Sequence, residues 1–430
     1  MLITGHKSKV VFMDIQKHIW GIWGYGIGGK SLVTFLRTRG AQVLVYDKRE
    51  LNEHERAELS ASASTLCTSL DEFLSKSTCI IPSAGVDIRV YPNMSHTMIA
   101  ELDFFAQFFR KPIIAITGTL GKTTVTTLLA HMLERVGKRV LVGGNIGVGL
   151  CSLIDQQDMA DYAVLEVSSF QLEHCRSFAP AVAVWTNFFP NHLDRHASQE
   201  EYFMAKTQIL VRQAGEAVSL VPEDVLETLK LHAQYMHRWV SIPKEFPAAL
   251  AHFIAHQQGI TANWQVVAQT LEALSIDLEV LCEPYICAIE HRVELVRVLK
   301  DISFYNDSKA TVAQATLAAV NRFDSHKLIL LIGGLSKGVN REPLVHSLAN
   351  KVKLVICFGV EAEQLACWCE QNAICYKRAD QLAQAVKIGY AISEPGDVVL
   401  LSPAGSSFDL FSNYQERGRV FKELVNALEG

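Results

Sequence analysis

The sequence predicts an α/β protein built from about three domains. Short runs rich in Val, Ile and Leu alternate with amphipathic helical patterns along the chain. These runs are continuously apolar, as expected for strands of parallel sheets that helices cover on both faces. A length of 430 residues exceeds that of most single domains, which hold roughly 150 residues, and a hydrophobic content of 49% with 20% charged residues is typical of packed globular chains.

The order of predicted strands suggests where the domains divide. Breaks at Lys111-Pro112 and within 283–291 give domains of residues 1–110, 111–289 and 290–430, with residues 1–17 as an extension before the first strand. Residues 213–280 contain helical stretches at 225–236 and 264–274 but no chemical motif. The predicted strands are 18–24, 42–47, 112–118, 139–144, 162–168, 181–187, 327–334, 353–359 and 397–404.

Composition excludes several classes of partner. With 40 Lys and Arg against 45 Asp and Glu, the formal charge of -5 gives no electrostatic reason to bind nucleic acid. No apolar run approaches the roughly 20 residues of a membrane span, and the first residues do not resemble a secretory signal. The 10 cysteines lack paired metal-binding spacing. We therefore expect a cytoplasmic monomer with reduced thiols and no membrane insertion.

The first glycine-rich turn follows a predicted strand and reads Gly-x-Gly-x-x-Gly over residues 24–29, with Asp47 ending the next strand. Small residues let the backbone approach a diphosphate, and the following helix contributes oriented N–H groups. Taken alone, this turn favours a nicotinamide or flavin cofactor. A tight turn that binds no ligand is the alternative.

A second turn is the stronger indication of nucleotide binding. It lies between the strand at 112–118 and an amphipathic helix at 123–136. Its backbone N–H groups can wrap phosphates, the Lys122 amine can neutralise their charge, and the Thr123 hydroxyl can coordinate Mg²⁺. The usual spacing would require glycine where this chain has Ile116, so this is a shortened P-loop. It comprises Gly118, Thr119, Leu120, Gly121, Lys122, Thr123 and Thr124.

Several residues suited to metal and carboxylate chemistry follow the predicted strands of the same region. Glu166 lies at the end of one strand and Asn145 follows another, while His192, Asp194 and Lys206 lie further on. The carboxyl ends of parallel strands share one edge of a sheet, where ligands bind. Glu166 is therefore a candidate Mg²⁺ ligand.

Motifs in order along nearly the whole chain resemble those of the Mur ligases. Two of them, SSFQLE and the long motif nearest the C-terminus, resemble in particular the branch of that family that adds D-glutamate. The motifs are GTLGKTT at 118–124, GGNIG at 143–147, LEVSSFQLE at 165–173, TN at 186–187 followed by NHLDRH at 191–196, HR at 291–292, NDSKAT at 306–311, GGLSKG at 333–338 and SPAGSSFDLFSNYQERG at 402–418.

The resemblance implies an N-terminal Rossmann-like domain for a UDP-sugar, a central P-loop ATPase-like domain with a parallel sheet, and a C-terminal Rossmann-like domain for the amino acid. It also implies that the first glycine turn receives a uridine diphosphate, with NAD as the alternative. The candidate contacts to the UDP-substrate are Ile27, Gly28, Lys48, Arg49, Ser83, Asn145 and His192.

The reaction implied by the resemblance is an ATP-dependent amide ligation. The alanine carboxylate of UDP-N-acetylmuramoyl-L-alanine attacks the γ-phosphate of ATP, and the D-glutamate amine then displaces phosphate from the acyl phosphate. Lys122, His192 and Lys206 are the implied catalytic residues. Two Mg²⁺ ions are implied, with Thr123, Glu166, His192 and a carbamylated Lys206 as ligands.

The resemblance assigns the remaining candidates to ATP and to D-glutamate. Beyond the shortened P-loop, the ATP contacts are Asn263, Arg292 and Asp307. Two substrate carboxylates require donors and cations, and the residues implied around D-glutamate are Lys309, Thr311, Lys337, Ser407, Phe408 and Tyr414.

The chain departs from the family pattern at Asn191, at Val312 and at Gly259-Ile260, which affects the expected metal and adenine contacts. Three alternatives remain open. Another Mur ligase or a folylpolyglutamate synthase would share the P-loop but not SSFQLE. A dehydrogenase would explain only the first domain, and a nucleotide-binding protein without turnover would need no catalytic residue.

Overall fold

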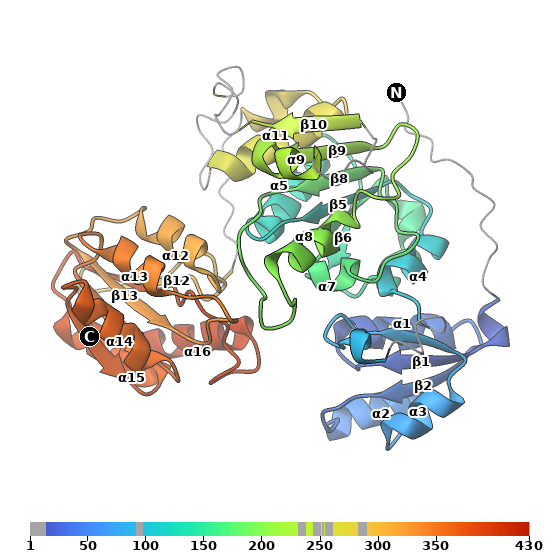
Figure 1. The fold of residues 1–430 in the computed structure, drawn as a ribbon, viewed down its shortest axis with the longest axis horizontal. Coiled ribbons are helices and arrows are strands. Elements are labelled where there is room, and N and C mark those ends of the chain that lie inside the picture. Colours follow the sequence, from blue (N-terminus) through green and yellow to red (C-terminus); the bar gives the residue numbers. More distant parts are fainter. Residues whose placement is uncertain are drawn as a thin grey trace. The chain divides into compact units, whose positions relative to one another are not determined.

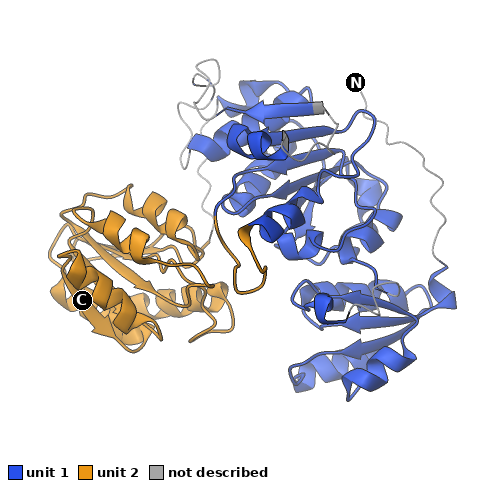
Figure 2. Cartoon of the chain, viewed as in Figure 1, with its two compact units in different colours: residues 1–189, 200–287 blue, residues 190–199, 288–430 orange. Residues whose placement is uncertain are grey.

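Three β-sheets, each flanked by helices, form the framework of the protein (Figure 1). The computed structural model describes residues 14–91, 98–230, 238–243, 251, 253, 261–282 and 290–429. The chain divides into unit 1, residues 1–189 and 200–287, and unit 2, residues 190–199 and 288–430 (Figure 2). The predicted α/β class is confirmed. The three domain boundaries stay predictions, and that within 283–291 lies largely outside the described residues.

The first sheet has four parallel strands in the order β3-β2-β1-β4. Helices α1 and α4 pack their apolar side chains on one face, and α3 packs on the other. Both faces are thus covered, which explains the continuous apolar runs. The elements are β1 Ile19–Trp23, α1 Ile27–Arg37, β2 Gln42–Tyr46, α2 Glu53–Ala61, β3 Thr65–Leu66, α3 Leu70–Lys76, β4 Cys79–Pro82 and α4 Glu101–Phe108.

The second sheet, also in unit 1, has six parallel strands in the order β10-β9-β8-β5-β7-β6. Helices α5 and α11 cover one face, while α7 and α8 contribute to the core on the other. The elements are β5 Ile113–Thr117, α5 Lys122–Arg135, β6 Val140–Gly144, α6 Cys151–Ile154, β7 Tyr162–Glu166, α7 Ser169–Leu172, β8 Val182–Trp185, α8 Gln199–Thr207, β9 Val218–Pro222, α9 Glu223–Lys230, β10 Arg238–Ile242 and α11 Thr261–Ala273.

The third sheet, in unit 2, has six strands in the order β11-β12-β16-β13-β14-β15, and only β11 is antiparallel to its neighbour among these described strands. Helices α12, α13 and α14 pack on one face, and α15 and α16 on the other. The elements are β11 Glu294–Leu299, β12 Ile302–Asn306, α12 Ala313–Val320, β13 Leu328–Gly333, α13 Glu342–Leu348, β14 Leu354–Phe358, α14 Ala362–Gln371, β15 Tyr376–Ala379, α15 Leu382–Ile392, β16 Val398–Leu401 and α16 Tyr414–Asn426.

The fold begins earlier than expected. Residues 1–13 of the expected extension lie outside the described part of the chain, but Ile15–Lys17 form a short 3-10 helix. The Trp20 indole donates a hydrogen bond to the Ile15 carbonyl over 2.9 Å, and the Ile15 side chain is buried. Ile15 is therefore packed beside β1, while the extent of the first domain stays a prediction.

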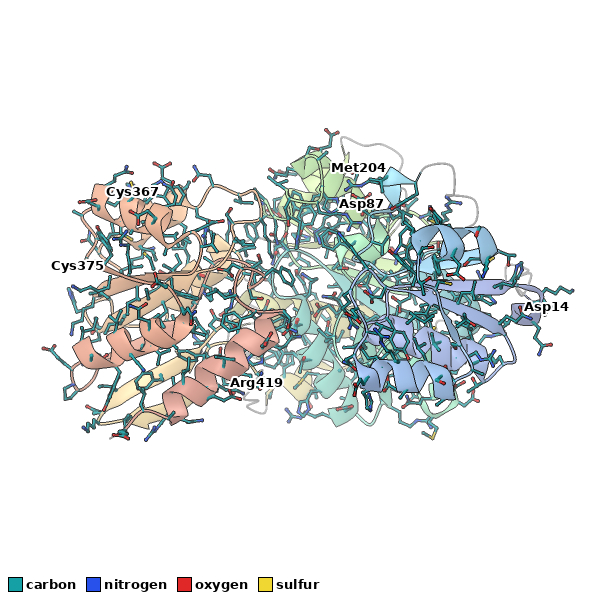
Figure 3. The ribbon with its side chains drawn as sticks, turned by 90° about the horizontal axis from the view of Figure 1, so that it is seen from below. Asp14, Asp87, Met204, Cys367, Cys375 and Arg419 are labelled. Carbon is teal, nitrogen blue, oxygen red and sulfur yellow. The ribbon has the colours of Figure 1, made fainter. Side chains whose placement is uncertain are left out.

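Two further findings concern the described helices and cysteines. Within the described ranges, no helix combines the length and the apolar character that crossing a membrane requires. Every cysteine that the structure describes is a free thiol, and two of them, Cys367 and Cys375, lie exposed on unit 2 (Figure 3).

Trp20→Ala should destabilise the first domain by about 3–5 kcal/mol, because the side chain is fully buried and its ring lies 5.1 Å from that of Phe104. Hydrogen exchange of the β1 and β2 amides measures this loss. The matched control is Trp368→Ala, at a half-buried tryptophan in α14. Equal protection of β1 in wild type and Trp20→Ala would contradict the assigned packing.

Candidate active site

The shortened P-loop connects β5 to α5, as the sequence predicts, and its two glycines are conformationally required. Gly118 has φ +139° and Gly121 has φ +81°, in the region that favours glycine. A Cβ on Gly118 would lie 2.0 Å from Thr186 Oγ1, and a Cβ on Gly121 would lie 2.6 Å from Asn263 Oδ1. Asn263, a predicted ATP contact, therefore lies directly beside the loop.

Residues at the end of β8 hold the middle of this loop. The Leu120 N–H donates to Asn187 Oδ1 over 2.8 Å, and the Leu120 carbonyl accepts from Thr186 Oγ1 at 2.5 Å and Asn187 Nδ2 at 3.0 Å. The Thr119 N–H donates to the Asn187 carbonyl at 3.1 Å. Sequence reasoning gave these two residues no role, although a Thr-Asn pair directly after a strand beside the loop was a usable indication.

Two lysines converge on one carbonyl of the loop. Lys122 Nζ and Lys206 Nζ each donate to the Gly118 carbonyl over 2.9 Å, and Lys122 also donates to the Thr119 carbonyl at 3.0 Å. Lys206 is 1% exposed, and its ammonium lies 4.7 Å from the centre of the Tyr202 ring. Burial lowers the pKa of Lys206 well below its usual range, and the Lys122 cation lowers it further, against the opposing effect of Glu166.

A buried carboxylate lies at the next strand end. Glu166 Oε2 accepts from Thr123 Oγ1 over 2.6 Å, and its Oε1 accepts from Asn145 Nδ2 over 2.8 Å. The backbone N–H of Asn145 also donates to the Glu166 carbonyl at 2.8 Å. A hydroxyl, a carboxylate and an amide gathered beside a phosphate-binding loop are hard oxygen ligands, so these residues fit Mg²⁺. The half-buried Thr124 lies in the first turn of α5.

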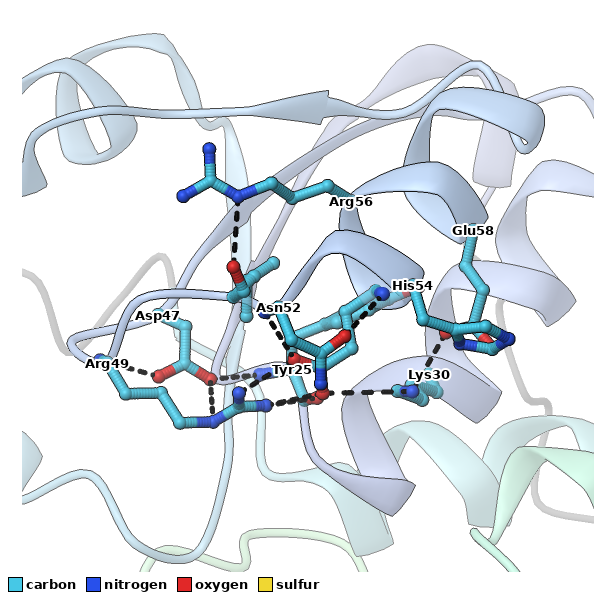
Figure 4. A network of polar contacts seen from close by, with 10 residues as sticks. Tyr25, Lys30, Asp47, Arg49, Asn52, His54, Arg56 and Glu58 are labelled. Atoms are coloured by element: carbon cyan, nitrogen blue, oxygen red, sulfur yellow. Dashed lines mark hydrogen bonds and ion pairs between the residues drawn. The ribbon is translucent and has the colours of Figure 1, made fainter.

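The turn after β1, where the sequence predicts a diphosphate, carries a dense polar network (Figure 4). Asp47 accepts from the Tyr25 N–H at 2.8 Å and the Arg49 N–H at 2.9 Å. Arg49 donates two hydrogen bonds of 2.7 Å to Glu55, which lower the pKa of Glu55 to about 2. Arg49, a predicted substrate contact, is thus already paired with a carboxylate.

The other candidates around this turn differ in exposure. Ile27 is 67% exposed at the first position of α1, and Lys48 is also exposed. A Cβ on Gly24, which has φ +102°, would lie 2.6 Å from Ser83 Oγ, so Ser83 lies against the turn. At Gly28 an added Cβ would lie 3.0 Å from Glu101 Oε1. Burial raises the pKa of Glu101 to about 7.

Unit 2 contains the predicted contacts to the amino acid, four of which form two close pairs. Lys337 Nζ donates to Thr311 Oγ1 at 3.3 Å, and Lys309 Nζ lies 5.1 Å from the centre of the Tyr414 ring. Ser407 is buried, whereas Phe408 is 70% exposed beside it in sequence.

One of the two candidate nucleotide contacts in unit 2, Asp307, is a buried acid. Asp307 accepts from Ser402 Oγ at 2.7 Å and from the Val293 N–H at 3.3 Å. Burial raises the pKa of Asp307 to about 7, and the Arg292 cation opposes this shift. Burial thus favours the protonated form of this carboxyl.

His192 belongs to the segment 190–199 of unit 2 and has φ +57°. Its N–H donates to Asn191 Oδ1 at 2.9 Å, a bond that the expected aspartate could also accept. The same segment lies against the motif that contains Lys337, since a Cβ on Gly338 would lie 3.3 Å from the Leu193 carbonyl carbon. Of the other departures, Val312 is the buried N-cap of α12, and Gly259-Ile260 lies outside the described residues.

Sequence reasoning also missed two buried arginines that shape unit 2. Arg341 donates to the Gly333 and Gly334 carbonyls at 3.0 and 2.9 Å. Arg417 donates to the Gly405 carbonyl at 3.1 Å. Both hold the loops that follow β13 and β16. The Arg-Gly pair at the end of the last motif pointed to Arg417, but no pattern pointed to Arg341.

Two family models match most of the chain. The Mur ligase middle domain model matches residues 116–279, and the Mur ligase, glutamate ligase domain model matches residues 291–405. A UDP-N-acetylmuramoylalanine–D-glutamate ligase from Desulfotalea psychrophila is 34% identical, over 95% of this chain and 96% of the relative. A relative of the same name from Acidobacterium capsulatum is 32% identical, also over 95% of this chain and 96% of the relative.

Solved structures share the fold at low identity. The UDP-N-acetylmuramate–alanine ligase of Thermotoga maritima aligns with a TM-score of 0.59 at 17% identity, over 95% of this chain and 99% of that one. FolC of Escherichia coli, in complex with DHPP and ADP, aligns with a TM-score of 0.56 at 15% identity, over 80% of this chain and 99% of that one. Family models and full-length relatives together establish that this chain belongs to the Mur ligase family.

Proposed function

We propose that this chain is an ATP-dependent ligase that joins D-glutamate to UDP-N-acetylmuramoyl-L-alanine in peptidoglycan synthesis. The observation that carries the proposal is the convergence of Lys122 and the buried Lys206 on the Gly118 carbonyl, beside Glu166. The identity of the two substrates is proposed from the names of relatives that match nearly the whole chain.

The first chemical step is phosphoryl transfer to a carboxylate. The shortened P-loop binds the ATP phosphates through its N–H groups, and Lys122 offsets the charge that gathers as the substrate carboxylate approaches the γ-phosphate. An acyl phosphate and ADP result. The D-glutamate amine then attacks the acyl carbon, and phosphate leaves as the amide forms.

Thr123 and Glu166 would hold a Mg²⁺ ion, with His192 proposed as a ligand of a second one. When bound, Mg²⁺ neutralises phosphate oxygens and orients the γ-phosphate for in-line attack. The hydrogen bond between the Thr123 hydroxyl and Glu166 places these two oxygen ligands side by side.

Lys206 is suited to become a carbamate. Its low pKa favours the neutral amine, which can add CO₂ to give a carbamate anion and release one proton. This change places an anion beside the Lys122 cation and supplies a further metal ligand.

D-Glutamate would be bound by unit 2. Lys337 and Thr311 form one polar pair, Lys309 and Tyr414 form another, and Ser407 and Phe408 belong to the neighbouring loop. Two substrate carboxylates need such cations and hydroxyl donors. We further propose that the enzyme acts as a monomer in the cytoplasm, since one chain supplies every candidate residue and the described cysteines are free thiols.

Phosphate release from ATP with UDP-N-acetylmuramoyl-L-alanine should depend on D-glutamate. L-Glutamate, L-alanine and a diamino acid serve as competing acceptors in the same assay. Release at least ten times faster with D-glutamate than with any other acceptor is the expected outcome. A preference for another amino acid would assign the chain to a different ligase of the family.

Lys122→Ala should lower kcat by about 10²–10³-fold, because it removes one cation that opposes charge in the transition state. The matched control is Lys138→Ala, which removes an exposed lysine after the same helix. Steady-state phosphate release measures both variants. Near wild-type kcat in Lys122→Ala would refute the role of the loop lysine.

Lys206→Ala should lose activity and partly regain it on addition of formate or acetate, which can occupy the site of the carbamate. Lys206→Arg provides the control, because arginine fills the site and does not form a carbamate. Activity that short carboxylic acids leave unchanged in Lys206→Ala would count against the carbamate.

A further inference from the structure

A partly buried polar contact joins the loop after β4 to α8, the helix that contains Lys206. Arg89 lies in the 3-10 helix Ile88–Val90, on the loop after β4. Arg89 Nη1 lies 2.6 Å from Glu201 Oε1 in α8, and its Nε lies 3.5 Å from Glu173 Oε1 at the end of α7. Figure 3 labels Asp87 and Met204 on the two segments that this contact joins.

Arg89 is itself fixed in place from its own domain. Its guanidinium donates to both oxygens of Asp87, over 2.8 and 2.6 Å, and this pairing raises the pKa of Arg89 above its usual range. Asp87 also accepts the backbone N–H of Arg89 at 3.1 Å. The side chain is therefore directed by Asp87 and spans to two helices of the second domain, as a planar guanidinium can.

Two further residues of α8 contact the shortened P-loop. One residue after Glu201, the Tyr202 hydroxyl lies 3.2 Å from Thr119 Oγ1. One turn further on, Lys206 donates to the Gly118 carbonyl. A shift of α8 would thus displace both groups that contact the loop, and misplacement by about 1 Å can cost 10²-fold in rate.

We propose that Arg89 is a positioning residue, which ties the domain of the first glycine turn to α8 and so sets where Lys206 meets the phosphate-binding loop. The inference rests on the proposed function only for the role of Lys206. A shift of the loop that contains Arg89 would therefore move α8 and, with it, Lys206. Arg89 itself touches no reacting atom.

The test is Arg89→Ala, which keeps the backbone N–H that Asp87 accepts and so leaves the 3-10 helix capped. Its matched control is Arg139→Ala. This change removes a surface arginine, just before β6, that forms an ion pair with Asp161. We expect kcat to fall 10- to 100-fold in Arg89→Ala and less than 2-fold in the control. The KM for D-glutamate should stay unchanged, because the predicted contacts to that substrate lie in unit 2.

A double-mutant cycle separates positioning from general destabilisation. If Arg89 acts through α8, Arg89→Ala combined with Glu201→Gln should be no slower than the slower single variant. Multiplication of the two single effects, or a lowered thermal midpoint with kcat retained in Arg89→Ala, would overturn the proposal.

Hydrogen exchange provides a readout that does not depend on the reaction. Amides of residues 199–207 should exchange at least 5-fold faster in Arg89→Ala than in wild type and in Arg139→Ala. If wild type shows no D-glutamate-dependent phosphate release, the proposed function fails while this measurement still tests the contact. Unchanged exchange in α8 would overturn the proposal even if the enzyme is active.

Discussion

The structure of the candidate site depends on the Gly118 carbonyl, which accepts hydrogen bonds from two lysine side chains at once. Burial and the Lys122 cation lower the pKa of Lys206 and so disfavour a second cation on this oxygen, while Glu166 opposes the shift. The site therefore brings two lysine side chains to one carbonyl beside the Glu166 carboxylate.

The surrounding elements support this loop from three directions. The Thr-Asn pair after β8 fixes Leu120, Asn263 of α11 lies against Gly121, and α8 supplies Tyr202 and Lys206. Because α8 also binds Arg89, the site in the second domain is tied to the first. The chemistry of amide ligation requires that the nucleotide sugar and ATP be held in line, and a shared helix is a direct physical means to that end.

Much of this could be predicted from the sequence, because strands buried on both faces are continuous apolar runs and glycine turns have a fixed spacing. The loop at 118–124 and the acid at 166 followed from those rules. Seven of the described strands were not predicted. Strands β3, β4 and β15 are runs of only two to four residues, β11 and β12 have mixed exposure, and β9 and β10 lie in a segment without motifs. Ile15 was assigned to an extension because one apolar residue gives no periodic pattern, yet it packs beside Trp20.

The contacts between segments that lie far apart in the chain could not be predicted from the sequence. Arg89 and Glu201 are separated by 112 positions, and no local pattern marks either residue as a partner. Arg49 shows the opposite case, because its motif suggested a substrate contact while the structure pairs it with Glu55. Residue type and spacing therefore indicated which chemistry the chain can perform, whereas the hydrogen-bond partners that orient each group came only from the fold.

The most direct test of the account is the fate of the carboxylate oxygen. UDP-N-acetylmuramoyl-L-alanine labelled with ¹⁸O in its alanine carboxylate is incubated with the enzyme, ATP and D-glutamate, and the released phosphate is analysed by mass spectrometry. If the loop directs the γ-phosphate onto that carboxylate, each phosphate formed from doubly labelled substrate contains one ¹⁸O atom. Phosphate without label, formed together with the amide product, would contradict the account.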